Sequence, residues 1–150
     1  MIRLVPPDRK ITNEEKIQII KGFLGKEKSE VMNCVFLMIY HCQPITIKDL
    51  MNKMDNYYQN VKIFSVPGIK YHLRNLIKRG LINEKSLLDA KDSPSNPFSK
   101  KIMEKYKRLF ENFSVYDGFK HVHFYQISAF GEEFIEFSAM KAQWKVIKDD

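Results

Sequence analysis

Apolar side chains recur at the spacing of an α-helix through most of the chain. This pattern predicts helices over residues 13–24, 29–42, 47–54, 66–79, 98–113 and 129–144. Two shorter stretches, 81–88 and 121–128, have the residue types and the alternation of strands. Residues 55–64 fit either an extension of the third helix or a loop with a short strand. The pattern predicts a mainly helical protein whose two strands pair as an antiparallel hairpin interrupted by a helical insertion.

Local start and stop signals support these boundaries. Hydroxyl side chains precede the helices and are expected to cap them, at Thr12, Ser29, Thr46, Ser65 and Ser128. Glu15, three residues after the first of these, completes a capping box. Gly80 follows the 66–79 helix where a left-handed residue commonly ends a helix. Two prolines near the start exclude a helix over residues 1–10, so an extended arm is expected there.

The helix over residues 66–79 has two chemically distinct faces. Its apolar face consists of Val66, Ile69, Leu73, Leu76 and Ile77. The opposite face consists of Pro67, Gly68, Tyr71, Arg74, Asn75 and Lys78. Arginine can bind a guanine edge and asparagine an adenine edge through paired hydrogen bonds, while lysine and tyrosine suit phosphates. This face therefore suits a duplex groove, and a basic face that is merely solvated is the simpler alternative.

An excess of basic residues favours an anionic partner. The chain of 150 residues carries 25 Lys and Arg against 18 Asp and Glu, a formal net charge of +7. Its 44% hydrophobic content is typical of a folded globular protein. No apolar run approaches the roughly 20 residues of a membrane span. The first residues lack an apolar signal segment and the two cysteines provide no disulfide framework, so we expect a cytoplasmic location.

Two segments resemble parts of a known family. The sequence "HLRNLIKRGLINE" over residues 72–84 is similar to the recognition helix and first wing strand of winged helix-turn-helix regulators. It is closest to the ArsR group and is also similar to the MarR and PadR groups. The sequence "HFYQISAFGEEFIEF" over residues 123–137 resembles the second wing strand and the following helix. The motif positions of that second segment are held by Tyr125, Ile127, Ser128 and Gly131.

The resemblance implies a single winged-helix domain over residues 1–150. Its core would comprise residues 29–87 and 121–140, preceded by an arm and helix over 1–28 and interrupted by a wing insertion over 88–120. The implied fold class is mainly α (α+β), a winged helix-turn-helix with a two-stranded wing hairpin and extra N- and C-terminal helices. The chain departs from the family in this insertion and in the long link between the two helices of the motif.

The implied function is sequence-specific binding of double-stranded DNA by a transcriptional regulator. The regulator would act as a homodimer, joined through the apolar 29–42 helix and the aromatic-rich terminal helices, with helix 66–79 in the major groove. Arg74 and Asn75 would contact base edges, and the other residues mainly phosphates. The expected DNA-binding residues are Thr46, Lys48, Ser65, Gly68, Lys70, Tyr71, Arg74, Asn75, Lys78, Arg79, Lys85 and Lys120. Further wing candidates are Lys91, Lys100, Lys101 and His121.

Two other classes of binding protein remain open. The interrupted wing and the apolar stripe of the 98–113 helix would also fit a winged-helix module that binds a protein partner within a larger assembly. An RNA- or single-strand-binding protein would use aromatic side chains close to basic ones. The aromatic residues suited to that role are Tyr57, Tyr58, Phe64 and Tyr71.

Catalytic and metal-binding signatures are weak in this sequence. It contains no glycine-rich phosphate loop, zinc-protease motif or nucleophile elbow, so we expect no enzyme. His121 and His123 occupy alternate strand positions and could share a metal, with Cys34, His41 and Cys42 as further ligands. A two-residue pair does not define such a site, so we expect neither metal nor cofactor. The target DNA, any effector and the direction of regulation have no signature in the sequence.

Overall fold

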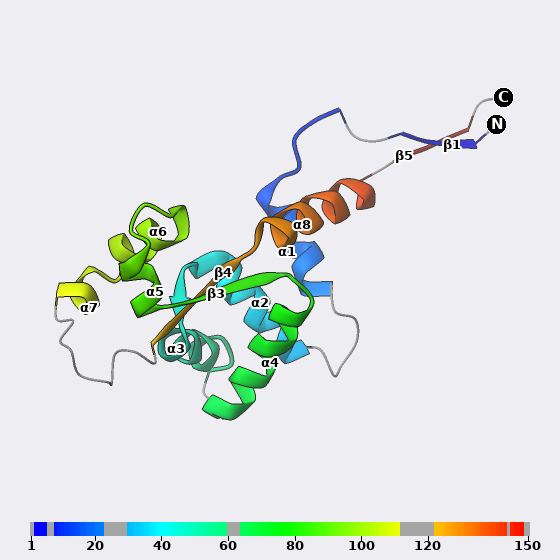
Figure 1. Ribbon diagram of the computed structural model, residues 1–150. Helices are drawn as coiled ribbons and strands as arrows, with labels where there is room; N and C mark the ends of the chain where they lie inside the picture. The colour runs from blue at the N-terminus through cyan, green and yellow to red at the C-terminus, as the bar shows by residue number, and fades with distance from the viewer. Residues whose placement is uncertain are drawn as a thin grey trace.

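The computed structural model describes residues 2–5, 8–22, 30–59, 64–111, 122–143 and 145–148, which are mainly helical around a small three-stranded antiparallel sheet (Figure 1). The helices are α1 (Asn13–Gly22), α2 (Glu30–Cys42), α3 (Ile47–Tyr57), α4 (Val66–Lys78), α5 (Leu87–Asp92), α6 (Pro97–Lys105), α7 (Lys107–Glu111) and α8 (Ala129–Ala142). The strands are β1 (Ile2–Val5), β2 (Ile45–Thr46), β3 (Ile82–Ser86), β4 (His123–Ile127) and β5 (Lys145–Lys148).

Side-chain caps fix where four of the helices begin. The N–H of Glu15 donates to the Oγ1 of Thr12 at 3.2 Å, and the N–H of Thr12 donates to Glu15 at 3.0 Å, which completes the predicted capping box of α1. Helices α3, α4 and α8 have the single cap, with Thr46, Ser65 and Ser128 accepting a backbone N–H at 3.2, 3.1 and 2.8 Å. These four predicted caps are confirmed. They could be predicted from the sequence because a cap depends only on residues within one turn.

Two glycines allow α4, β3 and the start of α8 to meet closely. Gly80 has a φ of 73°, the left-handed conformation predicted for the end of α4. A Cβ on Gly131 would lie 2.3 Å from the carbonyl oxygen of Leu81, so a larger residue does not fit. The N–H of Ser128 donates to that same oxygen at 3.0 Å. This junction fixes the end of α4 relative to the sheet.

The sheet has the strand order β2-β4-β3, and all its pairs are antiparallel. The pairing of β3 with β4 confirms the predicted hairpin strands, whereas β2 was not predicted. Glu84 lies opposite Tyr125, and Ser86 lies opposite His123. Because alternate strand residues point to opposite faces, these positions place His123 and Tyr125 on one face and Phe124 on the other.

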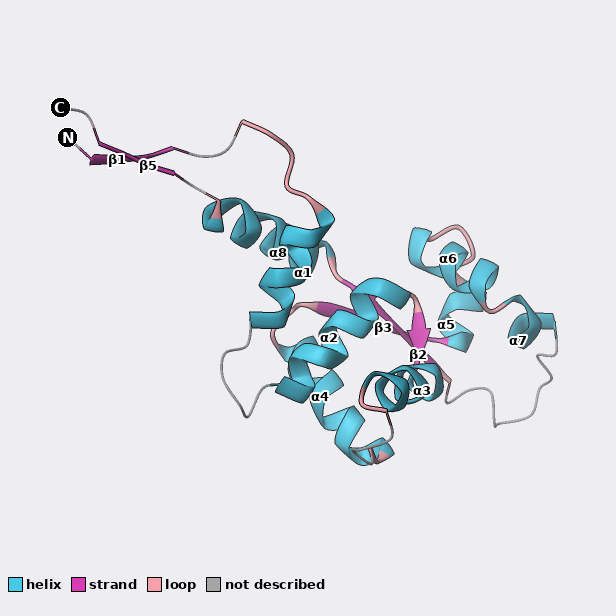
Figure 2. Cartoon of the chain, turned by 180° about the vertical axis from the view of Figure 1, so that it is seen from behind, coloured by secondary structure: helices cyan, strands magenta, loops and turns pink. Residues whose placement is uncertain are grey.

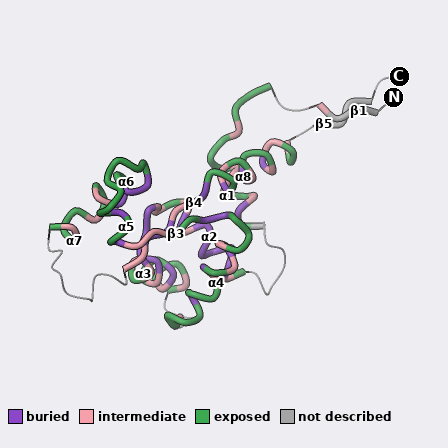
Figure 3. Tube along the Cα trace, viewed as in Figure 1, coloured by how far each residue is buried: buried purple, intermediate pink, exposed green. Residues whose placement is uncertain are grey.

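Each face of the sheet has its own hydrophobic cluster. The larger cluster joins α1, α2, α3, α4 and α8 to the face with Tyr125 and Ile127, and α2 contributes its largest group of buried side chains. The smaller cluster joins α5 and α6 to Phe124 on the other face. Helices α5–α7 gather at one end of the strands, away from α1 and α8 (Figures 1 and 2). The longest buried stretch lies in α2, and β2 and much of β4 are also buried (Figure 3).

Helix α2 is therefore a core helix of this chain. The sequence pattern left open whether its apolar surface lies in a core or between subunits. Val35, Phe36 and Ile39 are all fully buried within the chain. Most apolar side chains of α2 are therefore covered by the chain itself, whereas Val31, Met38 and Tyr40 are half-buried.

The insertion between β3 and β4 differs from its prediction in two places. The strand expected over 81–88 ends at Ser86, because the Oγ of Ser86 accepts the N–H of Asp89 and begins α5. The single helix expected over 98–113 is broken at Tyr106 into α6 and α7. The phenol of Tyr106 donates to Asp49 on α3 at 2.7 Å, and this tertiary contact holds the residue away from helical geometry.

The ends of the chain and the α3–α4 link also differ from expectation. Of the two alternatives left open for residues 55–64, helix extension holds as far as Tyr57, and residues 60–63 lie outside the described ranges. Helix α8 ends at Ala142, and β5 follows and pairs with β1 in a two-stranded ribbon that the sequence pattern did not indicate. The predicted cap at Ser29 and the end of the first helix at 23–24 lie outside the described ranges.

Candidate nucleic-acid interface

Helix α4 is anchored by its apolar face. Ile69, Leu73 and Leu76 are at most 1% exposed and pack in the larger cluster together with side chains of α2 and α3. Ser65 caps the first turn, and Pro67 lies where its missing N–H leaves no helical bond unmade. Most of the apolar face predicted from the sequence is therefore buried. Val66 departs from the prediction, because it is 42% exposed in the first turn, and Ile77 is half-buried. The opposite side of the helix is presented to solvent.

The outward side of α4 consists mainly of long polar side chains. Lys70, Arg74 and Lys78 are exposed, and Tyr71 is 61% exposed. Within the described part of the chain, none of the three cations has a hydrogen-bond or ion-pair partner. Asn75 is half-buried, and its side-chain N–H donates to the carbonyl of Tyr71 at 3.1 Å. The free charges lie along one side of the helix.

Several expected DNA-binding residues act in local structure. Thr46 is buried; its hydroxyl caps α3, and its backbone N–H donates to the phenol of Tyr106 at 3.2 Å. The N–H of Gly68 donates to the Oγ of Ser65 at the start of α4, so both groups are already hydrogen-bonded within the helix cap. Lys48 is exposed on the first turn of α3.

The remaining expected residues lie farther from the outward side of α4. Arg79 is exposed and terminates the helix. Lys85 is half-buried, and its Nζ donates to the Oγ of Ser99 at 3.1 Å and lies 5.5 Å from the centre of the Phe98 ring. That lysine is thus bound to the insertion. Lys120 lies outside the described ranges.

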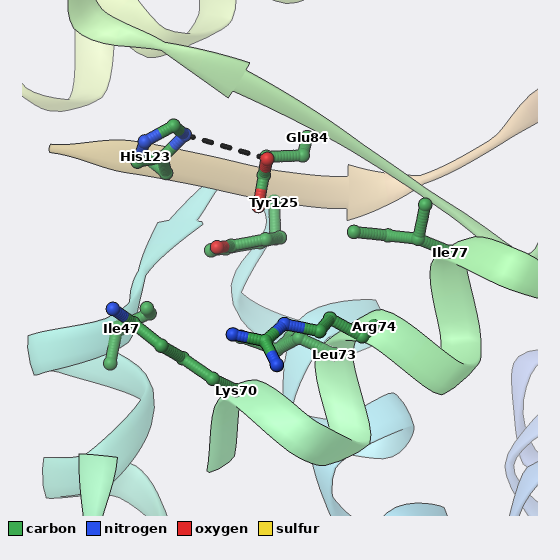
Figure 4. Close-up of a pocket in the computed structure, with 8 residues that line it drawn as sticks. All are labelled: Ile47, Lys70, Leu73, Arg74, Ile77, Glu84, His123 and Tyr125. Carbon is green, nitrogen blue, oxygen red and sulfur yellow. Dashed lines mark ion pairs between the residues drawn. The ribbon is translucent and has the colours of Figure 1, made fainter. Parts of the chain in front are cut away.

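A pocket of about 420 Å³ lies between α4, the start of α3 and the sheet (Figure 4). Its lining residues are Ile47, Lys70, Leu73, Arg74, Ile77, Glu84, His123 and Tyr125. Sequence reasoning did not assign Glu84 or Tyr125 to a site. Their antiparallel register was the available signal, because facing residues on adjacent strands share one face.

The sheet wall of this pocket carries an acidic group, Glu84, beside Tyr125 and His123. Burial, followed by a hydrogen bond to Glu84, raises the pKa of Tyr125 above its ordinary value, while the charge of Arg74 acts in the opposite direction. The phenol therefore stays protonated. The Nδ1 of His123 lies 3.5 Å from the carboxylate of Glu84, close enough for an ion pair if protonated but without hydrogen-bond geometry.

One buried titratable group lies beside the outward side of α4. His72 is half-buried, and its Nδ1 is inaccessible and has no hydrogen-bond partner. Burial lowers the pKa of His72, because a charged imidazolium is poorly solvated there. The ring packs edge-on against Tyr71 at 5.5 Å between centroids. The neutral imidazole is therefore the form that suits the folded chain.

The candidate metal pair, His121 and His123, is described only in part. Among the residues that the structure describes, no three His, Cys, Asp or Glu side chains gather in a way that could hold a metal ion. His121, one half of the pair, lies outside those ranges. Across the same residues, no helix is long and apolar enough to cross a bilayer.

Comparison with known proteins adds no assignment. No protein-family model matches the chain. Neither a curated protein nor a solved structure matches it. The functional reading therefore depends on the geometry of α4 and its surroundings.

Proposed function

We propose that this chain binds double-stranded DNA through α4 as a winged-helix transcriptional regulator. The observation that carries the proposal is the contrast across α4. Ile69, Leu73 and Leu76 are buried and fix the helix, and three exposed cations on the other side have no partner within the described residues. A groove-binding helix needs both features. The order α3, α4, β3, insertion, β4 and α8 agrees with the order of parts in a winged helix.

The side chains of α4 suit different contacts with a duplex. Arg74 can make two hydrogen bonds to a guanine edge, and Lys78 and Tyr71 can bind phosphates on either side of the groove. Asn75 has one amide N–H committed to the helix backbone, so it would contribute its remaining donor and its carbonyl oxygen. Arg74 is therefore the main proposed determinant of base preference, and Lys78 a determinant of overall affinity.

A homodimer of this regulator would be joined through α8. Two of its aromatic side chains, Phe130 and Phe137, lie seven residues apart and are each 55% exposed. Residues at this spacing share one side of a helix. Since most apolar side chains of α2 are buried within the chain, α8 is the better candidate for contact with a second copy.

The proposal can be tested by comparing two substitutions on α4. Arg74→Ala should lower affinity for the preferred duplex by about 1–3 kcal/mol and relax the preference at one base pair. Lys78→Ala should weaken all duplexes alike. Binding to a randomised duplex library, followed by sequencing of the bound fraction, measures both effects.

Lys101 is a wing candidate from the sequence, but it lies on α6, which packs on the opposite face of the sheet from α4. Lys101→Ala is therefore the matched control, because Lys101 is exposed and its loss changes the net charge equally. It should leave affinity and base preference unchanged. If Lys101→Ala weakens binding as much as Lys78→Ala, affinity depends on net charge alone, and α4 is not the helix that contacts the duplex. Preferential competition by single-stranded nucleic acid would favour a single-strand-binding protein.

A further inference from the structure

The pocket beside α4 has the composition of a small-molecule site. Its volume of about 420 Å³ falls within the range of roughly 300–1,000 Å³ typical of ligand pockets. Its walls come from three elements that are distant in sequence: the start of α3, one side of α4, and the sheet formed by β3 and β4 (Figure 4). Apolar side chains and a few charged groups converge on the same space.

The α4 wall of the pocket is cationic. Lys70 and Arg74 lie four residues apart and therefore on the same side of the helix. Figure 4 shows the ends of both side chains in the space between α4 and β4. Neither cation has a hydrogen-bond or ion-pair partner among the described residues, although Arg74 acts electrostatically on Tyr125. Two unpaired cations beside one cavity attract an anionic group.

The other walls restrict what kind of anion can enter. Ile47, Leu73 and Ile77 provide an apolar surface, which suits a hydrocarbon or aromatic body. Across from the cations, the carboxylate of Glu84 lies beside Tyr125 and faces the imidazole of His123. A carboxylate in that position repels a second anionic group and accepts a hydrogen bond from a hydroxyl or amine.

We propose that this pocket binds a small organic anion: a single carboxylate or phosphate ester at Lys70 and Arg74, with an apolar body against Ile47, Leu73 and Ile77. The cations would hold the anion through charge-assisted hydrogen bonds. A nucleic-acid chain fits less well, because it would bring several phosphates close to Glu84 and leave the apolar wall unused. The pocket therefore shares two cations with the outward side of α4 and adds an apolar wall and a carboxylate.

One consequence rests on the proposed DNA binding. Lys70 and Arg74 belong both to this pocket and to the proposed duplex contact. An anion bound in the pocket offsets part of this positive charge and holds the guanidinium away from a base edge. Ligand and duplex therefore compete, and the organic anion lowers duplex affinity.

The site can be tested with 2-naphthoate and phenyl phosphate as anionic probes and 2-naphthamide as the neutral match. The full chain, without DNA, is titrated while its NMR chemical shifts are recorded. At least one anion should bind saturably with a Kd of about 1 mM or tighter, with shifts at the pocket residues. Since charge-assisted bonds are lost in the neutral amide, 2-naphthamide should bind roughly tenfold more weakly than 2-naphthoate.

Charge-matched variants distinguish binding of the anion in the pocket from nonspecific electrostatic attraction to α4. Lys70→Met and Arg74→Met should each weaken the bound anion roughly tenfold. Lys78→Met removes the same charge from α4 outside the pocket, so it should change the Kd by less than about twofold. No saturable binding by either anion, equal binding of naphthoate and naphthamide, or equal weakening by Lys78→Met would each overturn the proposal.

A second titration tests the competition. The probe that binds is added to a preformed complex with a fluorescent duplex. The apparent Kd for DNA should rise by a factor of one plus the ratio of the free probe concentration to the Kd of the probe for the pocket. Binding of the probe without displacement of duplex supports the pocket and overturns the competition. If the chain binds no duplex at all, the proposed function fails, while the NMR titration still decides the pocket.

Discussion

The two sides of the sheet differ in what their basic side chains do. On the α4 side, Lys70, Arg74 and Lys78 are exposed and have no hydrogen-bond or ion-pair partner among the described residues. On the insertion side, Lys85 donates to Ser99 at 3.1 Å, and Lys105 donates to backbone carbonyls at the end of α2. The sequence pattern alone predicts basic residues on both sides of the sheet and does not distinguish the two sets. The contacts show that the first set is available to a partner and that these two insertion lysines serve the fold.

Lys105 and Tyr106 connect the insertion to the α2–α3 turn. The Nζ of Lys105 donates to the carbonyls of Cys42 and of Pro44, the latter at 2.7 Å, and thereby satisfies oxygens at the end of α2. The phenol of Tyr106 donates to Asp49 and accepts the N–H of Thr46. The insertion is therefore fixed to the beginning of α3. We infer that it stabilises the α3–α4 pair, while α4 supplies the free charges.

The largest expected effect is on the core of the insertion. Ile102→Ala removes a fully buried side chain from the smaller cluster and should lower the free energy of unfolding by about 2–5 kcal/mol. Ile102→Val, as the graded control, should cost about 0.5–1.5 kcal/mol. Urea denaturation measures both values.

The same two variants test whether the sides are independent. Under conditions in which Ile102→Ala remains folded, its affinity for duplex DNA should equal that of the unsubstituted chain. If affinity for DNA falls together with stability, the insertion contributes directly to binding. That result would contradict the assignment of binding to the α4 side alone.

A smaller effect is expected at the contact between the two sides. Tyr106→Phe removes a hydrogen bond to a carboxylate and leaves the N–H of Thr46 without its acceptor. The free energy of unfolding should fall by about 1.5–3 kcal/mol. Tyr71→Phe removes a hydroxyl from an exposed side chain on α4. It should change the free energy of unfolding by no more than about 0.5 kcal/mol. Equal effects of the two substitutions would show that the Tyr106 contact does not anchor the insertion.

The smallest of these effects is a pH dependence on the α4 side. Burial lowers the pKa of His72 in the folded chain, so below about pH 6.5 the unfolded chain binds a proton more readily. The stability contributed by the neutral imidazole is present above that pH and is lost as the pH falls toward the lowered pKa. His72→Leu should therefore lose less stability than the unsubstituted chain between about pH 7.5 and pH 5.

Thermal unfolding across this pH range measures the difference. His41→Leu, a substitution at an exposed histidine, is the control for removing an imidazole. An identical pH profile for His72→Leu and the unsubstituted chain would contradict the role assigned to burial of His72.

Local signals were sufficient for part of the fold and of the candidate site. Ser65, Gly80 and Ser128 act as predicted, because a cap or a left-handed stop depends on residues within one turn. The buried face of α4 follows from apolar periodicity, and pairing of β3 with β4 follows from their strand patterns.

Other features depend on contacts between distant parts of the chain. The break at Tyr106 follows from its hydrogen bond to Asp49, which is 57 residues away. The ribbon of β1 and β5 joins opposite ends of the chain, and neither strand has a strong pattern of its own. The pocket likewise required the register that places Glu84 beside Tyr125. Sequence patterns identify elements, but their partners are set by tertiary structure.

The central claim is that the partner-free cations of α4 bind duplex DNA. The most direct test is the duplex association constant measured at several salt concentrations for the unsubstituted chain, Lys78→Ala and Lys101→Ala. Each phosphate neutralised by α4 contributes roughly −0.9 to the slope of log K against log salt. The account predicts a steep slope that becomes shallower by about 1 in Lys78→Ala and is unchanged in Lys101→Ala. A flat salt response, or an equal change in the two variants, would contradict it.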